Sequence, residues 1–251
     1  MSDEAPEEDS VAWTSRATAG GARSQAREEG KPRVGRSGSD DHTAYLSGDR
    51  SPLGALRRLL SGNRRFVSGL ETEGRDIEQA LRVAERPTPL ALVIGCMDSR
   101  VPPEVVFDQG IGDLLVVRTG GHVLDQVALA SVELAVSKLG VPLITVLGHE
   151  SCAAVEYAVD AVHRNARPGG PLGYLVDQIA PSVPMDSALS GTQTYQGAIR
   201  GHIASVVSAV RAVPVVTEAV GSARVTVAGL YYDVTLGEIT LTVEPDRPAD
   251  G

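Results

Sequence analysis

Hydrophobic residues along the chain gather in short runs, and longer amphipathic stretches separate these runs. Three runs, over residues 90–95, 114–117 and 141–147, consist mostly of apolar residues. Such runs are typical of strands that are covered on both faces, as in a parallel sheet. Two later stretches, residues 224–231 and 239–243, are predicted to form strands that a hairpin-type turn connects.

The spacing of apolar residues marks the first helix, and an N-cap residue followed by an apolar stretch marks the second. One amphipathic helix is predicted to begin just after Ser51, where leucines recur between arginines. Another is predicted from about Gln126 to Leu139, with Asp125 as its N-cap. The apolar residues of this second helix do not form a single stripe. We therefore expect it to be buried between the sheet and another element, such as a second subunit.

Two further helices are predicted in the second half of the chain. One should be capped by Ser151 and end near Asn165, and the other should span residues 194–210. The Gly- and Pro-rich segment 168–191 between them is interpreted as a connection. Strands that alternate with helices predict an α/β fold, with a mostly parallel central sheet flanked by helices.

Residues 1–50 differ from the rest of the chain because they are rich in small polar and charged residues and have few large aliphatic ones. Such a composition cannot bury enough apolar surface to offset the entropy that ordering costs. We interpret residues 1–50 as a disordered acidic and polar tail, and residues 51–247 as one folded domain. A docking or regulatory segment is the alternative interpretation of the tail.

Composition narrows the possible partners. The chain has 251 residues, of which 42% are hydrophobic, and a net charge of −9. Nucleic acid is not expected as a partner, because phosphate binding requires clustered Lys and Arg. No run approaches the ~20 apolar residues of a membrane helix, and the first thirty residues lack the apolar core of a signal peptide. We therefore expect a cytoplasmic protein with no membrane partner.

The candidate chemistry lies at the ends of two predicted strands. Cys96 and Asp98 follow the first buried run, and His149 and Cys152 follow the third. Because parallel strands end at the same edge of a sheet, these side chains should face one another. Two thiolates and one imidazole suit zinc, and the fourth position is left for Asp98 or for water. The alternative is a pair of inert buried thiols beside a structural histidine.

The motifs around these residues resemble a known family. Cys96-Met97-Asp98-Ser99-Arg100, together with His149-Glu150-Ser151-Cys152, is similar to the paired signature of bacterial-type β-class carbonic anhydrases. The resemblance extends through residues 62–66 and 117–122 and the region of Tyr231, and covers roughly residues 51–245. It implies a Rossmann-like β-carbonic anhydrase fold with an N-terminal helical arm.

The resemblance also implies the site and its reaction. Cys96, His149 and Cys152 would bind one zinc ion per subunit, beside a catalytic pair formed by Asp98 and Arg100. Asp98 either pairs with Arg100, leaving the fourth zinc position to water, or itself ligates the zinc, and both states stay open. The implied enzyme is a carbonate dehydratase, a zinc lyase. It would hydrate carbon dioxide reversibly to bicarbonate and a proton through attack by zinc-bound hydroxide.

The charge of the implied site predicts its pH dependence. A zinc ion with two thiolates and a neutral imidazole has no net charge, whereas a site of three imidazoles keeps the full charge of the ion. The neutral site is the weaker Lewis acid, so the pKa of its bound water should lie above the ~7 of a three-histidine site. Hydration activity should therefore rise on the alkaline side.

Two rival functions and the state of assembly stay open. A hydrolase for carbonyl sulfide or carbon disulfide can use the same scaffold. A noncatalytic zinc-binding protein is the second rival, although it would not need Asp98 and Arg100. The family resemblance implies a homodimer or tetramer, because relatives form dimers or multiples of dimers.

Three histidines outside the ligand set are candidate proton carriers. His122 is the best placed of them, but a structural or surface role is the more common one for such a residue. His163 and His202 lie on predicted helices, where we expect them to be solvated.

Overall fold

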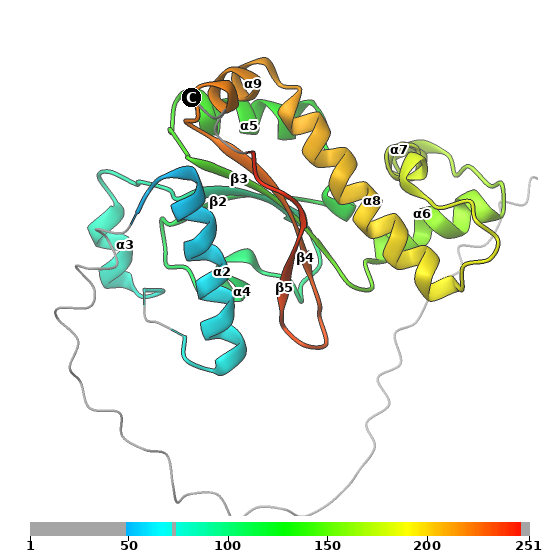
Figure 1. Ribbon diagram of the computed structural model, residues 1–251, viewed down its shortest axis with the longest axis horizontal. Coiled ribbons are helices and arrows are strands. Elements are labelled where there is room, and N and C mark those ends of the chain that lie inside the picture. The colour runs from blue at the N-terminus through cyan, green and yellow to red at the C-terminus, as the bar shows by residue number, and fades with distance from the viewer. Residues whose placement is uncertain (1–48, 72–73, 247–251) are drawn as a thin grey trace, which may run out of the picture. The chain divides into compact units, whose positions relative to one another are not determined.

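The computed structural model describes residues 49–71 and 74–246. The predicted tail over residues 1–50 lies almost wholly outside the described residues. Its disorder and the predicted domain boundary therefore stay predictions. The described residues form a five-stranded sheet with helices on both faces (Figure 1).

The sheet is mostly parallel, as the sequence predicts. Its strands are β1 (Ala91–Cys96), β2 (Leu114–Thr119), β3 (Leu143–His149), β4 (Thr226–Tyr232) and β5 (Ile239–Val243). They lie in the order β2-β1-β3-β4-β5, and only β5 runs antiparallel to its neighbour. All five predicted strands are confirmed. Strands β1 and β3 extend beyond their predicted apolar runs, and their last residues are the candidate ligands Cys96 and His149.

Helices cover the two faces of the sheet unequally. The first face carries α5 (Gln126–Ser137), α6 (Ala153–His163), α7 (Gly170–Ile179), α8 (Gly191–Arg211) and α9 (Pro214–Gly221). The second face carries α2 (Pro52–Ser68) and the short α4 (Pro103–Val106), and α3 (Ile77–Val83) follows α2 along the chain. Two 3-10 helices, η1 (Gly120–His122) and η2 (Ala180–Ser182), complete the described elements.

Strand side chains alternate between two apolar clusters. Ile94 and Ile144 belong to the cluster shared with α6 and α8. Val93 and Leu143 belong to the cluster shared with α2. Both faces of β1 and β3 are buried, which explains why their sequences are unbroken apolar runs and do not alternate between apolar and polar residues.

Helix α2 is fixed to the sheet by the motif at residues 62–66. Gly62 lies so close to the carbonyl oxygen of Phe107 that a Cβ atom would come within 1.7 Å of it. The buried Asn63 donates to the carbonyl oxygens of Val106 and Gly237 and accepts from the N–H of Ile239. This part of the motif therefore holds α2 against α4 and the β4–β5 hairpin.

Two predictions about helices were wrong. Ser151 does not cap α6: its φ is +51°, and Cys152 is the N-cap residue, without a side-chain hydrogen bond. Segment 168–191 is not a plain connection, because it contains α7 and η2. Gly and Pro lie within the first turn of α7, where proline is tolerated, and Val176 and Ile179 of that helix are buried.

The prediction for α5 was partly correct. Asp125 caps the helix by accepting from the N–H of Ala128. Ala128 and Val132 face the core, whereas Val127 is 73% exposed and Leu134 is 52% exposed in the single chain. The helix therefore presents apolar residues on both its inner and its outer side.

No single helix in the described ranges is long and apolar enough to cross a membrane. Helices α8 and α9 together reach that length and composition, but they bend by 85° at the break between them.

Candidate metal centre

Two neighbouring strands and one helix carry the three candidate ligands. Cys96 is the last residue of β1 and His149 is the last residue of β3, and these strands pair in parallel. Cys152 is the N-cap residue of α6, three residues after His149. All three side chains are buried. The carboxyl edge of the sheet therefore brings together the residues that the sequence predicts as ligands.

The distances within this cluster suit a metal ion. The two sulfur atoms and a ring nitrogen of His149 all lie within 4.8 Å of one another. The two Sγ atoms are 3.8 Å apart, which is well beyond the ~2.05 Å of a disulfide bond. Both cysteines are free in the described part of the chain. Two sulfurs and one imidazole nitrogen form a donor set that zinc prefers.

His149 presents an available lone pair to this cluster. Its Nδ1 lies 2.8 Å from the carbonyl oxygen of Glu150, which can only accept, so Nδ1 carries the proton. Nε2 is then the unprotonated nitrogen. It is buried and has no hydrogen-bond partner among the described residues. An unpaired buried acceptor is costly, and a metal ion would satisfy it, so the residues fit zinc.

The two thiols share a hydrogen bond that separates their acidities. Donation from Cys152 lowers the pKa of the Cys96 thiol and raises the pKa of the Cys152 thiol. Burial opposes the charged form of both groups. A divalent cation between the sulfurs would stabilise both thiolates, because its charge replaces the single shared proton.

Asp98 is held beside the cluster by Arg100. Arg100 donates from Nε to Oδ1 at 3.0 Å and from Nη2 to Oδ2 at 2.7 Å, and it also reaches the carbonyl oxygen of Ser151 at 3.0 Å. These bonds from Arg100 lower the pKa of Asp98 to about 2. Asp98 Oδ2 lies 4.0 Å from Nε2 of His149. The geometry is that of the paired state, and Asp98 as a zinc ligand stays a prediction.

Arg118 is a site residue that our sequence reasoning did not single out. It extends from β2 and donates from Nε to the carbonyl oxygen of Cys96 at 2.8 Å. Its Nη2 donates to the carbonyl oxygen of Asp98. Arg118 therefore holds the backbone that carries one ligand and the carboxylate. Its place in the motif at residues 117–122 was the available signal.

The three further histidines differ in how deeply they are buried. His163 is exposed, as predicted. His202 was predicted to be solvated, and this was wrong, because the residue is only 2% exposed. His122 is fully buried, and burial holds the pKa of both His122 and His202 below the usual value. Location on a helix does not reveal which face packs inward, and α8 packs along the sheet.

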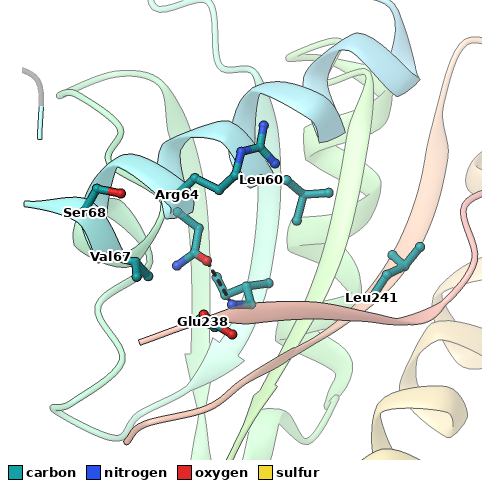
Figure 2. Close-up of a pocket in the computed structure, with 8 residues that line it drawn as sticks. Leu60, Arg64, Val67, Ser68, Glu238 and Leu241 are labelled. Carbon is teal, nitrogen blue, oxygen red and sulfur yellow. Dashed lines mark hydrogen bonds between the residues drawn. The ribbon is translucent and has the colours of Figure 1, made fainter. Parts of the chain in front are cut away.

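A separate cavity of about 400 Å³ lies between α2 and β5. Figure 2 shows residues that line it, including Leu60 and Arg64 of α2 and Leu241 of β5. None of its lining residues belongs to the cysteine–histidine cluster. The cluster, and not this cavity, is therefore the candidate site.

The amino-acid sequence of the chain is similar to the sequences of known carbonic anhydrases. A family model described as carbonic anhydrase matches residues 91–239. Carbonic anhydrase 2 of Mycobacterium tuberculosis is 36% identical over 195 residues, which cover 76% of this chain and 93% of that protein. The carbonic anhydrase of Mycolicibacterium smegmatis is 46% identical over 136 residues, which cover 53% of this chain and 65% of that protein.

Solved structures show the same fold. A Coccomyxa β-carbonic anhydrase in complex with acetazolamide has a TM-score of 0.61 at 24% identity, covering 76% of this chain and 87% of that chain. A β-carbonic anhydrase of Sordaria macrospora, described as tetrameric, has a TM-score of 0.59 at 22% identity, covering 68% of this chain and 89% of that chain. The chain therefore belongs to the carbonic anhydrase family, and its fold is that of the β class.

Proposed function

We propose that this chain binds one zinc ion through Cys96, His149 and Cys152 and uses it to hydrate carbon dioxide reversibly to bicarbonate and a proton. The observation that carries the proposal is the buried Nε2 of His149, which has no hydrogen-bond partner in the described ranges and lies within 4.8 Å of two free sulfurs beside the Asp98–Arg100 pair. Bound zinc would supply a water molecule acidic enough to lose its proton on the alkaline side of neutral pH.

The Asp98–Arg100 pair would orient the reacting water. The carboxylate of Asp98 stays ionised at neutral pH because its pKa is about 2, so it can only accept a hydrogen bond. Accepting from the water would turn a lone pair of the water oxygen toward the carbon of the substrate. Arg100 holds the carboxylate through two side-chain bonds, and its contact with Ser151 ties this pair to the loop before α6.

Two other functions have less support from the site. A carbonyl sulfide or carbon disulfide hydrolase would use the same ligands, and family membership favours carbon dioxide. A noncatalytic zinc protein needs only the ligands. The two-point contact between Arg100 and Asp98 is a feature that such a site does not require, and it supports catalysis.

A homodimer or tetramer is the assembly we propose. Val127 and Leu134 on α5 are exposed in the single chain, and burying such side chains in a second copy would remove them from water. The Sordaria macrospora relatives are described as tetrameric, which is compatible with this proposal. The cytoplasm stays our prediction for the location of the protein.

Parallel assays with the candidate substrates test the function. We would measure the hydration of carbon dioxide by stopped flow with a pH indicator, and the release of hydrogen sulfide from carbonyl sulfide and carbon disulfide. The proposal predicts fast hydration and little sulfide. The hydrolase is supported if sulfide release is the faster reaction, and the noncatalytic protein is supported if zinc is bound without turnover of any substrate.

A further inference from the structure

The 3-10 turn η1 reaches the metal cluster through its backbone. The turn contacts β1, the strand that ends in Cys96, and the backbone N–H of Gly121 is a hydrogen-bond donor toward the Cys96 sulfur that lowers the pKa of this thiol. Gly121 has a φ of +58°, and a Cβ atom there would lie 3.1 Å from the side chain of Ala154 and 3.2 Å from that of Ile179. The position of this N–H therefore depends on a tightly packed turn in a conformation that favours glycine.

A buried histidine holds the same residue from the other side. Nε2 of His202, in the middle of α8, lies 3.0 Å from the carbonyl oxygen of Gly121. A carbonyl oxygen only accepts, so Nε2 carries the proton. Burial lowers the pKa of His202 to about 4, which keeps the ring neutral at physiological pH. His202 is therefore a fixed donor to the turn.

The surroundings keep this donor in place. The ring of His202 lies 4.7 Å, between centroids, from the ring of the fully buried His122, which belongs to the same turn. The next residue on α8, Ile203, packs so closely on Gly148 that a Cβ atom there would lie 2.6 Å from it. Helix α8 thus contacts both the turn beside Cys96 and the strand end that carries His149.

We propose that His202 is a positioning residue for the metal centre, because its bond to the Gly121 carbonyl holds the turn whose N–H reaches the Cys96 sulfur. The inference rests on the proposed zinc site. Without the bond from His202, the turn that packs beside the ends of β1 and α6 would be free to shift, so the ligands Cys96 and Cys152 would be less firmly placed and zinc would bind less tightly. Outer partners of metal ligands typically change affinity or activity by about 10- to 100-fold.

Three variants separate this role from simple packing. His202→Phe keeps a ring in the core but removes the donor. His202→Gln returns an N–H donor at a similar distance from the backbone. His163→Phe is the matched control, because His163 is exposed at the end of α6. Thermal unfolding of each variant checks the fold.

The readouts are metal affinity and a spectroscopic signature. We would measure the zinc dissociation constant by competition with a chromophoric chelator, and the sulfur-to-metal charge-transfer band of the protein loaded with Co²⁺. His202→Phe should weaken zinc binding by about 10-fold or more and move the band to longer wavelength, because a thiolate without its hydrogen bond gives up an electron more easily. His202→Gln should recover most of both changes, and His163→Phe should show neither.

Folded His202→Phe protein with the zinc affinity and the band of the wild type would overturn the proposal. Nitrogen-15 NMR of the wild-type chain gives a check that needs no variant: His202 should be the neutral tautomer with its proton on Nε2 down to about pH 5, and a proton on Nδ1 would overturn the proposal. A wild-type chain that binds zinc but does not hydrate carbon dioxide would contradict the proposed function, whereas these readouts would still decide the role of His202.

Discussion

At the scale of single residues, His149 and Asp98 are each controlled by one well-placed neighbour. The carbonyl oxygen of Glu150 fixes the tautomer of His149, and Arg100 fixes both the direction and the charge of Asp98. These contacts cost little reorganisation during a reaction, because they exist before the substrate arrives. The resemblance to the family implied the roles of these residues, whereas the carbonyl partner of His149 could not be predicted from residue types alone.

Replacing Arg100 tests the pair at this scale. Arg100→Ala should lower the hydration rate by roughly 10- to 100-fold, because Asp98 loses its partner and can turn toward the metal. Arg100→Lys should recover only part of the rate, since lysine cannot make the same two-point contact. Stopped-flow hydration measures both effects. Arg164→Ala, which removes an exposed arginine from the end of α6, is the control and should leave the rate unchanged.

The pH dependence of hydration tests the charge of the site. The rate should rise through the alkaline range, because two thiolates neutralise the charge of the zinc ion and leave a weak Lewis acid. Asp98 cannot cause this rise, since its pKa is about 2 and it is ionised throughout. A stopped-flow profile that is already flat from mildly acidic pH upward would show that the charge argument is wrong.

At the scale of helices and strands, the sequence predicts best the elements that are marked by an unbroken apolar run. The buried strands β1 and β3 were found from their apolar runs. Helix α7 was missed because Gly170 and Pro171 suggested a loop, although both residues suit the start of a helix. Burial of His202 could not be predicted either, since it depends on how α8 lies on the sheet.

The buried His202 should make the stability of the fold depend on pH. An unfolded histidine binds its proton near pH ~6.5, whereas folded His202 does so only near pH 4. Its contribution to stability is therefore complete above pH ~6.5 and is lost as the pH falls toward 4, by up to about 1.4 kcal/mol per pH unit.

Urea unfolding between pH 7 and pH 5 measures this effect when wild type and His202→Gln are compared. The stability of the wild type should fall more steeply, because glutamine does not titrate, so the gap between the two proteins should shrink as the pH is lowered. His163→Gln serves as the control and should follow the wild type. Parallel curves for wild type and His202→Gln would contradict the assigned cause.

At the scale of the whole molecule, the apolar outer side of α5 is the feature that a single chain leaves unexplained. Val127 and Leu134 are exposed there, while the inner side of the same helix already packs in the core. Exposed apolar side chains on an ordered helix are typical of an interface between subunits. The sequence pattern predicted contacts on both sides of this helix but did not identify the occupant.

A charge on this helix tests the proposed assembly. Val127→Lys should lower the molar mass measured by light scattering during size-exclusion chromatography, because burying a lysine at an apolar interface is unfavourable. Ser208→Lys adds the same charge at an exposed position of α8 and should leave the mass unchanged. A monomeric wild type, or a Val127→Lys protein of unchanged mass and fold, would contradict the role of α5.

Zinc at the cysteine–histidine cluster is proposed to drive hydration, and a zinc titration of the metal-free chain tests this most directly. Hydration of carbon dioxide, followed by stopped flow, should rise in proportion to added zinc and stop rising at one ion per chain. Cys96→Ser, which loses one thiolate, should show little activity at the same zinc concentrations. Full hydration without metal, or full hydration by Cys96→Ser at one equivalent of zinc, would contradict the account.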